Sequence, residues 1–271
     1  NIEMMNMLGE PFKEEYRIGF AKGNSELESI INDVLEELVN SQFISEKIKL
    51  HSATSESKTG IVQEIKSNLF ENNRINQLLN GLMITFKITV FALMTGIFLG
   101  YVTAFTILSK SKNFFVKTLQ LLAKAYVSVI RGTPVVCQLF IMYYIIIGPF
   151  GVDNVISAIL AFGINSGAYV SEVIRSGILS VDSGQIEAGK ALGLNDSQIM
   201  SGIIAPQALK NSLAALCNEF IQLLKETSVA GFIGVMDLNK VGETIRAQTL
   251  SPVIPLLSVA LTYFIIVCLV G

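Results

Sequence analysis

Charged side chains are scarce in this sequence. Lys, Arg, Asp and Glu together supply 15% of the 271 residues, whereas hydrophobic residues supply 51%. An average soluble domain carries about a quarter charged residues, so this composition is unusual for a water-soluble protein. The charges are also uneven, being dense before about residue 80 and sparse after it. We therefore predict a membrane-embedded region that follows a more polar N-terminal region.

Basic clusters, cysteine and histidine are equally sparse. The formal net charge is -2, and no run of Lys and Arg is present that could neutralise phosphates, so we predict no nucleic-acid partner. The three cysteines, Cys137, Cys217 and Cys268, lie far apart in apolar segments, and the single histidine, His51, has no neighbouring ligand. Neither a disulfide framework nor a metal site is predicted.

Nucleotide-binding and catalytic motifs are missing as well. The sequence has no Gly-x-x-x-x-Gly-Lys-Ser/Thr loop, whose backbone amides would hold phosphate groups. It also has no set of nucleophile, base and orienting residue. We predict that the chain is not an enzyme and that it binds no cofactor itself.

The first 50 residues read as part of a soluble domain. A strand is predicted at 16–21, and an amphipathic helix at 27–38 follows the turn residues 23–25. One strand and one helix cannot bury a self-sufficient core, so we expect residues 1–50 to be a fragment of a larger domain. A polar linker is predicted at 51–74.

The ends of the sequence are consistent with a piece of a longer chain. The first residue is Asn1 rather than Met, and the last residue, Gly271, falls inside an apolar run. We therefore expect the C-terminal region to be truncated.

Residues 75–271 are predicted to form a transmembrane domain. An uncharged run of about 20 residues, at 1.5 Å per residue, can cross a hydrocarbon core about 30 Å thick. The fourth of five candidate spans is less apolar than the others because it contains Lys210 and Glu219. The five candidate spans are 88–108, 132–148, 154–174, 203–224 and 252–270.

A GxxxG pair, Gly96 and Gly100, lies in the first predicted span. Such a pair lets a second helix backbone approach closely, although glycines can also be simply tolerated in a membrane helix. Both interpretations remain open from the sequence.

Basic residues predict the orientation. Lys110, Lys112 and Lys117 follow the first span, whereas the loop at 150–153 has no basic residue, so the positive-inside rule places residues 109–117 in the cytoplasm. With five spans, the loop at 176–202 is then also cytoplasmic and the N-terminal segment is extracellular.

The predicted loop carries a motif that resembles the coupling motif of ABC importer permeases. That motif reads Glu-Ala-Ala, three residues, Gly, nine residues, Ile, one residue, Leu-Pro. The matching positions are Glu187, Ala188, Gly193, Ile203 and Pro206, while Gly189 and Ala205 depart from it. The resemblance implies that the loop from Gln185 to Pro206 binds a separate ATPase subunit, which would bind the ATP and Mg.

Local chemistry agrees with a helix, a turn and a second helix in this loop. Gly193 can adopt the left-handed conformation that ends a helix, and Asn195 or Asp196 can cap the next one. The alternative is an ordinary interhelical loop rich in Ala and Gly.

Other segments resemble the permeases of polar amino-acid importers, the histidine, glutamine and arginine group. These segments are Arg131–Pro134, Asn165–Tyr169, Asn218–Phe220 and Lys225–Ser228. The resemblance implies a mostly α fold with about five transmembrane helices in the bacterial cytoplasmic membrane. It also implies an amino-acid substrate and pairing with a second permease subunit, either an identical copy or a paralogue.

The N-terminal segment is similar to the end of an extracellular amino-acid-binding protein. The similar residues are Tyr16–Phe20 and Lys22–Leu27. This similarity implies a binding domain fused ahead of the permease, although an unrelated soluble helix remains an alternative.

Two polar stripes are predicted to line a substrate path. Polar residues inside spans usually face the bundle interior or a water-filled path. We expect Arg131 or Lys225 to donate to a substrate carboxylate and Glu172 or Glu219 to accept from its ammonium. The full candidate set is Arg131, Asn165, Tyr169, Glu172, Asn218, Glu219, Gln222 and Lys225, with Ser176 and Glu226 beside it. The alternative is that these residues are interhelical ties, with Glu172 and Arg175 paired at i, i+3.

Two other functions stay open from the sequence. Related permeases share the coupling motif but carry different cargo, so another small solute is one alternative. A membrane-tethered solute sensor is the other, although a sensor has no need of an ATPase-binding loop.

Overall fold

The computed structural model describes residues 2–5, 11–14, 29, 33 and 61–270. The chain divides into two units, residues 1–61 and 62–271. In the first unit, strands β1 (Ile2–Met5) and β2 (Pro11–Glu14) pair antiparallel, with Ile2 opposite Glu14.

The strand predicted at 16–21 lies outside the described residues. Of the helix predicted at 27–38, the structure describes only Ser29 and Asp33, which are both helical and exposed. The proposed solute-binding fragment therefore stays a prediction.

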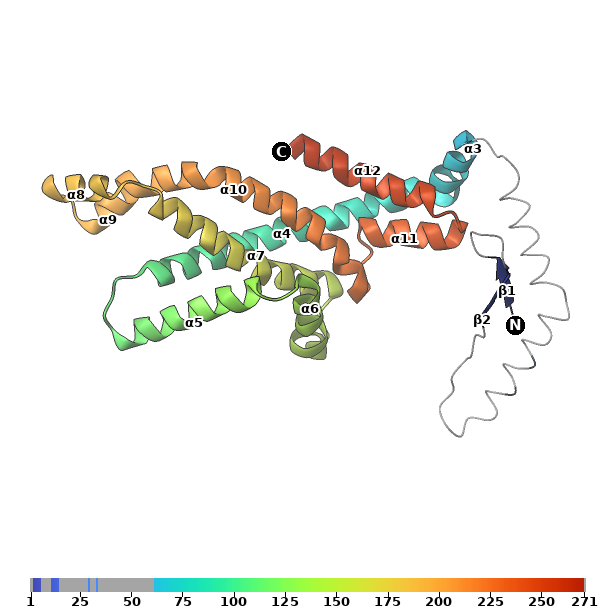
Figure 1. The fold of residues 1–271 in the computed structure, drawn as a ribbon, viewed down its shortest axis with the longest axis horizontal. Coiled ribbons are helices and arrows are strands. Elements are labelled where there is room, and N and C mark those ends of the chain that lie inside the picture. Colours follow the sequence, from blue (N-terminus) through green and yellow to red (C-terminus); the bar gives the residue numbers. More distant parts are fainter. Residues whose placement is uncertain (1, 6–10, 15–28, 30–32, 34–60, 271) are drawn as a thin grey trace. The chain divides into compact units, whose positions relative to one another are not determined.

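The second unit is a bundle of helices (Figure 1). Its α-helices are α3 (Ile61–Ile65), α4 (Arg74–Leu108), α5 (Phe114–Arg131), α6 (Val135–Phe140), α7 (Asn154–Leu179), α8 (Ser183–Ala191), α9 (Asp196–Ile199), α10 (Ala205–Glu226), α11 (Leu238–Thr249) and α12 (Val253–Val270). Its π-helical segments are η1 (Lys66–Phe70), η3 (Ile141–Ile147) and η5 (Met200–Ile204). Its 3-10 segments are η2 (Glu71–Asn73), η4 (Gly148–Phe150) and η6 (Thr227–Ile233).

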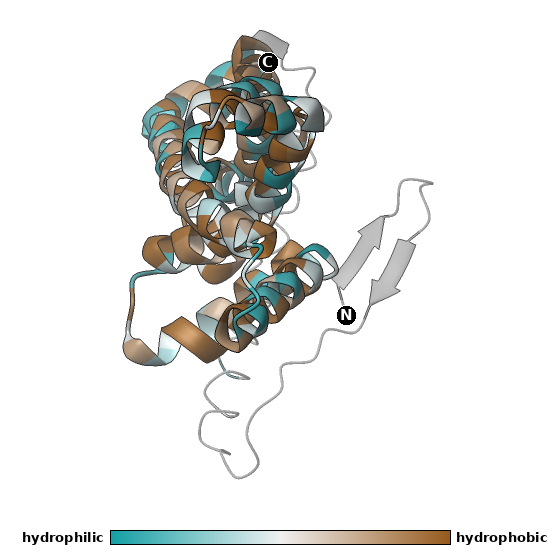
Figure 2. Cartoon of the chain, turned by 90° about the vertical axis from the view of Figure 1, so that its left-hand side faces the viewer, coloured by the Kyte–Doolittle hydropathy of each residue, from teal (hydrophilic) through white to brown (hydrophobic). Residues whose placement is uncertain are grey.

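Three helical runs in the described part of the chain are long and apolar enough to cross a membrane: Gln63–Leu108, Asn154–Leu179 and Val253–Val270. A fourth candidate is the bent pair of Phe114–Arg131 and Val135–Phe150, whose halves meet at 113°. Helix α10 is long enough to span a membrane but is less apolar than these helices, which agrees with its weak signal in the sequence. Hydrophobic residues recur along the helices (Figure 2), and many large ones are exposed, among them Phe98, Leu121 and Phe264.

The first long helix begins earlier than predicted. Helix α4 starts at Arg74 rather than near residue 88, because the polar amphipathic stretch before the apolar run continues as the same helix. The N-cap, Asn73, has a left-handed backbone (φ 60°) and separates this helix from η2.

Successive long helices run in opposite directions (Figure 1). The connection between α4 and α5 lies at the same end of the bundle as α8 and α9, whereas α3 and the connection between α11 and α12 lie at the other end. This agrees with the prediction that residues 109–117 and 176–202 share one side of the membrane.

Helices α4 and α7 contact each other through glycines on both sides. A Cβ atom added to Gly96 would lie 2.8 Å from the Cβ of Ser166, and one added to Gly100 would lie 2.6 Å from Cγ1 of Val170. Distances below 3.0 Å are not tolerated without movement, so the two backbones lie as close as glycine allows. Of the two interpretations left open for the GxxxG pair, the structure therefore supports the close approach of a second helix.

The contact is reciprocal. A Cβ atom on Gly163 of α7 would lie 2.8 Å from the Cβ of Thr95, and one on Gly167 would lie 2.9 Å from the Cβ of Leu99. Because lipid competes for apolar surface, such close van der Waals packing is what holds membrane helices together.

The main hydrophobic core lies beside this contact. It brings together side chains from α4, α6, α7, α10 and η6, so the broken helix and the last third of the chain pack on the same α4 and α7 pair. Its buried residues are Ile88, Ala92, Leu139, Ala158, Ala161, Phe162, Leu223, Ala230, Ile233 and Val235.

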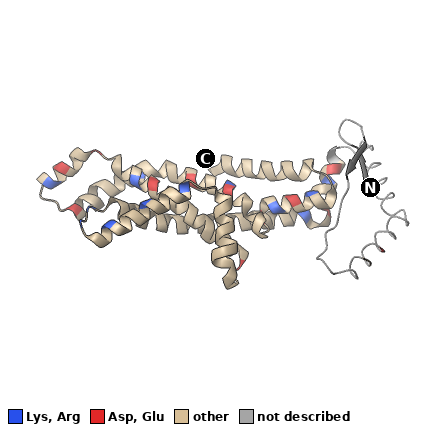
Figure 3. Cartoon of the chain, turned by 60° about the horizontal axis from the view of Figure 1, so that its bottom comes forward, with Lys and Arg blue, Asp and Glu red and all other residues tan. Residues whose placement is uncertain are grey.

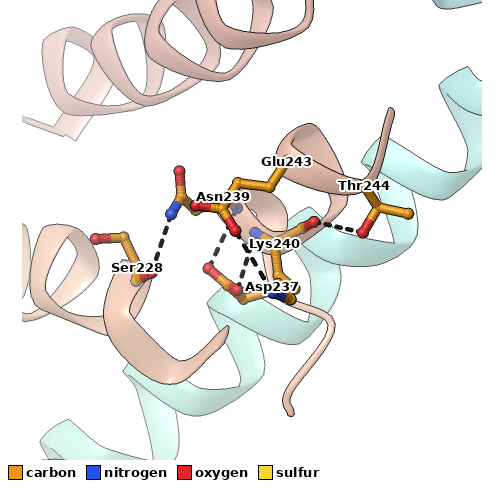
Figure 4. A network of polar contacts seen from close by, with 6 residues as sticks. All are labelled: Ser228, Asp237, Asn239, Lys240, Glu243 and Thr244. Atoms are coloured by element: carbon orange, nitrogen blue, oxygen red, sulfur yellow. Dashed lines mark hydrogen bonds and ion pairs between the residues drawn. The ribbon is translucent and has the colours of Figure 1, made fainter. Parts of the chain in front are cut away.

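Helix α11 begins inside the protein, where its free backbone amides need a partner. The fully buried Asp237 supplies it, because its carboxylate accepts from the backbone N–H groups of Asn239 and Lys240, both at 3.2 Å (Figure 4). The Asn239 side chain in turn donates to the carbonyl oxygen of Ser228. This N-cap fixes the turn between η6 and α11.

We predict that Gly100→Ala destabilises the bundle by about 1–3 kcal/mol, because the new methyl group overpacks the α4 and α7 contact. Gly202→Ala is the matched control, since no atom lies within 4 Å of a Cβ at that position. The measurement is the thermal unfolding midpoint of each purified variant in detergent. Equal midpoints for the two variants would contradict the close contact.

Candidate functional site

The predicted coupling loop is a helix, a turn and a second helix. Helix α8 is capped by Asp182, whose carboxylate accepts from the N–H of Gly184 at 2.6 Å. It ends where Gly193 adopts a left-handed backbone (φ 81°). The N–H of Gly193 donates to the carbonyl oxygen of Lys190 at 2.9 Å, and that of Leu194 donates to that of Gly189 at 3.0 Å. The role predicted for Gly193 as a helix stop is confirmed.

The next helix begins at the predicted cap. The side chain of Asn195 accepts from the N–H of Gln198, and the side chain of Gln198 accepts from the N–H of Asn195, both at 2.9 Å. Asn195, rather than Asp196, therefore caps α9. The π-helical η5 follows and runs directly into α10, in which Pro206 is the second residue.

Gly189, which departs from the Ala of the motif, is the buried residue of α8. A Cβ atom there would lie 2.9 Å from Cγ1 of Ile199 and 3.4 Å from Cδ1 of Ile203. The departure therefore allows α8 to pack tightly on α9 and η5. A small core under the loop, built on Val181, Ile199 and Ile204, makes the segment one packed body.

The opposite face of α8 is exposed. Glu187, Ala188 and Ala191 are exposed, and Leu192 is 81% exposed. A small and partly apolar face at the end of the bundle (Figure 1) can fit into a groove on another protein.

A polar cavity lies farther along the bundle. It has a volume of about 540 Å³ and is lined by the end of α5, by α7 and by α10. The predicted path residues Arg131, Tyr169, Glu172 and Glu219 line it, as does Ser176. Charged residues are few along the bundle (Figure 3), so this group is distinctive.

The charged residues of the cavity are held by named contacts. The guanidinium of Arg131 lies over the ring of Tyr169, 5.5 Å from its centroid. Glu219 is 7% exposed and accepts from the hydroxyl of Ser166 at 2.8 Å. Glu172 pairs with Arg175 of the next turn at 2.7 Å. The i, i+3 pair considered from the sequence is thus present, and Glu172 lines the cavity as well.

A second cavity, of about 390 Å³, meets the first one at Glu172. Arg175, Lys124 and Ser128 line it, together with residues at the end of α4. Glu172 therefore borders both cavities.

Three residues of the predicted α10 stripe lie outside the cavity. Asn218, Gln222 and Lys225 are exposed, and Gln222 donates to Glu226 on its own helix at 2.8 Å. The reason is geometric. Helix α10 buries the face that carries Ser212 and Glu219. The predicted stripe begins one residue earlier, at Asn218, so it lies about 100° around the helix axis from that face.

Asn165 also lies outside the cavity. It is 3% exposed, and its amide donates to the side-chain oxygen of Gln138 at 2.8 Å. Asn165 therefore links α7 to α6. A link between helices is the alternative that the sequence left open for this residue.

Sequence reasoning missed several polar residues of this region. Asn211 and Ser212 line the cavity, and Ser212 shares a face with Glu219 because seven residues make about two helical turns. That spacing could have identified Ser212. Gln138 could have been noticed as the only amide in the apolar run at 132–148.

Within the described part of the chain, no three His, Cys, Asp or Glu side chains are grouped as metal ligands would be.

A bundle of apolar helices with a charged cavity and a packed loop at one end defines a multi-pass membrane transport protein. Residues 96–271 match the model of a family described as binding-protein-dependent transport system inner membrane component. The chain belongs to this family, whose members are permease subunits of ABC importers. It is therefore a component of a transporter of the cytoplasmic membrane rather than an enzyme, as predicted.

Individual relatives agree with this family. GlnP of Rickettsia bellii, provisionally named a glutamine transport system permease protein, is 38% identical, covering 72% of this chain and 88% of the relative. The arginine transport system permease protein ArtQ of Bacillus subtilis is 38% identical, covering 70% of this chain and 85% of the relative. A crystal structure of an amino acid ABC transporter with histidines matches with a TM-score of 0.67 and 36% identity, covering 72% of this chain and 90% of that chain. The mostly helical permease fold predicted from the sequence is confirmed.

Proposed function

We propose that this permease subunit moves polar amino acids through the cavity that Arg131, Glu172 and Glu219 line. The observation that carries the proposal is a guanidinium and two carboxylates around one cavity of about 540 Å³, a volume within the range of about 300–1,000 Å³ usual for small-molecule sites. An amino acid offers one carboxylate, which the guanidinium can bind, and one ammonium, which a carboxylate of the cavity can bind.

Relatives support an amino-acid cargo without selecting one. The relatives named for glutamine and for arginine transport are equally identical to this chain, at 38%. The alternative of another small solute is less well matched, because a solute without charged groups gives no role to the guanidinium and the two carboxyl groups of the cavity. The cavity also offers Ser176, Asn211 and Ser212, which suit a polar side chain.

We also propose that the loop from Gln185 to Pro206 binds a separate ATPase subunit and that a second permease subunit, identical or paralogous, completes the path. The exposed Ala188 and Leu192 would enter a groove on the ATPase. On the buried side of the loop, Gly189 packs against Ile203 and stabilises it. ATP and Mg would be bound by that subunit.

The N-terminal region is proposed to lie outside the cell. Residues 1–50 would be the end of an extracellular amino-acid-binding domain, 51–74 a linker, and 75–271 the transmembrane domain. The two structural units meet at residue 61, within this range, and residues 62–74 belong to the helical unit.

Removing one carboxylate tests the path. Glu219→Gln keeps an oxygen for the hydroxyl of Ser166 but removes the charge, so uptake of labelled amino acids should fall at least about tenfold at normal abundance, since a hydrogen bond to a charged group contributes about 1.5–3 kcal/mol. Screening all twenty L-amino acids in the wild-type importer first identifies the cargo.

Glu226→Gln is the matched control for this experiment. It removes the same charge from the same helix outside the cavity, and uptake should stay near the wild-type rate. Normal uptake by Glu219→Gln would refute the proposed path.

Ala188→Glu tests the docking loop. The side chain is exposed, so the variant should fold and insert normally, but added bulk and charge should abolish co-purification of the ATPase and ATP-dependent uptake. Gln248→Glu adds the same charge to an exposed position on α11, at the other end of the bundle, and should have no effect. An assembled, active Ala188→Glu complex would show that the loop is not the docking site.

Cysteine labelling tests the orientation. In a variant that lacks Cys137, Cys217 and Cys268, Glu71→Cys should react with an impermeant maleimide on intact cells. Ser183→Cys should react only after lysis. Both positions are exposed, so the reverse pattern would invert the proposed topology.

A further inference from the structure

The helix break between α5 and α6 lies beside the polar cavity. The last residue of α5 is Arg131, and the chain then turns by 113° through Gly132, Thr133 and Pro134 before α6 begins. Proline has no N–H, and the residue before it is driven out of the helical conformation, so the last carbonyl groups of α5 lose their helical partners. Such groups need another donor when they are away from water.

The side chain of Gln138 supplies that donor. Its Nε2 lies 2.8 Å from the carbonyl oxygen of Ile130, 3.0 Å from that of Thr133 and 2.8 Å from the hydroxyl oxygen of Thr133. A residue of α6 thus reaches back across the break to the last turn of α5. Gln138 is 8% exposed, so water competes little for these contacts.

The same side chain also ties the break to α7. The Oε1 of Gln138 accepts from the amide of Asn165 at 2.8 Å. Tyr169, which lies one turn farther along α7, carries the guanidinium of Arg131 over its ring. Gln138 thus links the carbonyl group of Ile130 to Asn165, and the cation–π contact links Arg131 to Tyr169. Both contacts hold the end of α5 against the same face of α7.

We propose that Gln138 is a positioning residue of the transport cavity: it fixes the angle of the α5–α6 break and thereby holds Arg131 over Tyr169, where it faces the cargo. The inference rests on the proposed function, since Arg131 must act on the cargo for its position to matter. Gln138 itself does not line the cavity and acts through Arg131.

The test compares variants of the complete importer, co-expressed with its ATPase, for uptake of the identified amino acid per ATP hydrolysed. Gln138→Met has a similar shape but no amide, and Arg131→Gln removes the positioned charge. Each should lower the ratio about tenfold, the factor expected for weakening one charged hydrogen bond. The double variant should be no worse than Arg131→Gln, because residues that act through one another are not additive.

Tyr126→Phe is the matched control. The Tyr126 hydroxyl donates to the carbonyl oxygen of Ile164 at 2.5 Å, so this variant also removes a tie between α5 and α7, but it leaves the break untouched. It should keep the ratio of uptake to ATP hydrolysis even if stability falls.

Thr133→Val gives a milder variant in case Gln138→Met does not fold. Thr133 is exposed, and the change keeps the side-chain shape but removes both contacts of the hydroxyl, the one with Gln138 and its donation to the carbonyl oxygen of Val129. The ratio should fall part of the way, and hydrogen exchange of the amides at 130–140 should become faster in both break variants but not in Tyr126→Phe.

The outcomes separate the two proposals. A normal ratio in Gln138→Met or in Thr133→Val, with a low ratio in Arg131→Gln, overturns the positioning role and leaves the cavity proposal standing. A normal ratio in Arg131→Gln overturns the role of Arg131 in the path and the positioning role with it. Additive losses in the double variant also refute action through Arg131.

Discussion

The close contact between α4 and α7 is the constraint on which the rest of the bundle depends. Gly96 and Gly100 from one helix and Gly163 and Gly167 from the other each leave room for a side chain of the partner helix, so the two helices pack closely. Lipid solvates apolar side chains as well as a neighbouring helix does, so close packing of this kind supplies association energy that hydrophobicity cannot. Because α7 is held so closely, the remaining helices pack on a fixed element.

One turn of α7 then sets the positions of three other elements. Asn165 contacts Gln138 of α6, Ser166 donates to Glu219 of α10, and Tyr169 lies under Arg131 of α5. Each partner is buried or close to the polar cavity, where a missing hydrogen bond is costly. The charged groups of the cavity are therefore placed by polar contacts to a single rigid helix, and the glycine contact with α4 keeps that helix in place.

Local signals in the sequence predicted local structure well. The glycine stop at Gly193 and the cap at Asn195 follow from short-range backbone chemistry, which is why they could be read directly. The cavity face of α10 could not, because Asn218 and Glu219 are both polar and only packing against α7 decides which one turns inward. Gln138 was missed for a related reason, since its partners lie across a helix break.

The loop and the cavity are joined by one helix. Pro206 is the second residue of α10, next to the packed loop, and Glu219 lies thirteen residues farther on, about 20 Å along the axis at 1.5 Å per residue. Between loop and helix the backbone passes through the π-helical η5, an irregularity typical of functional positions. Coupling over such a distance needs a physical element with two arrangements that both sites bias. In the structure, one run of helical backbone from α9 through η5 to α10 is the physical connection between the loop and Glu219.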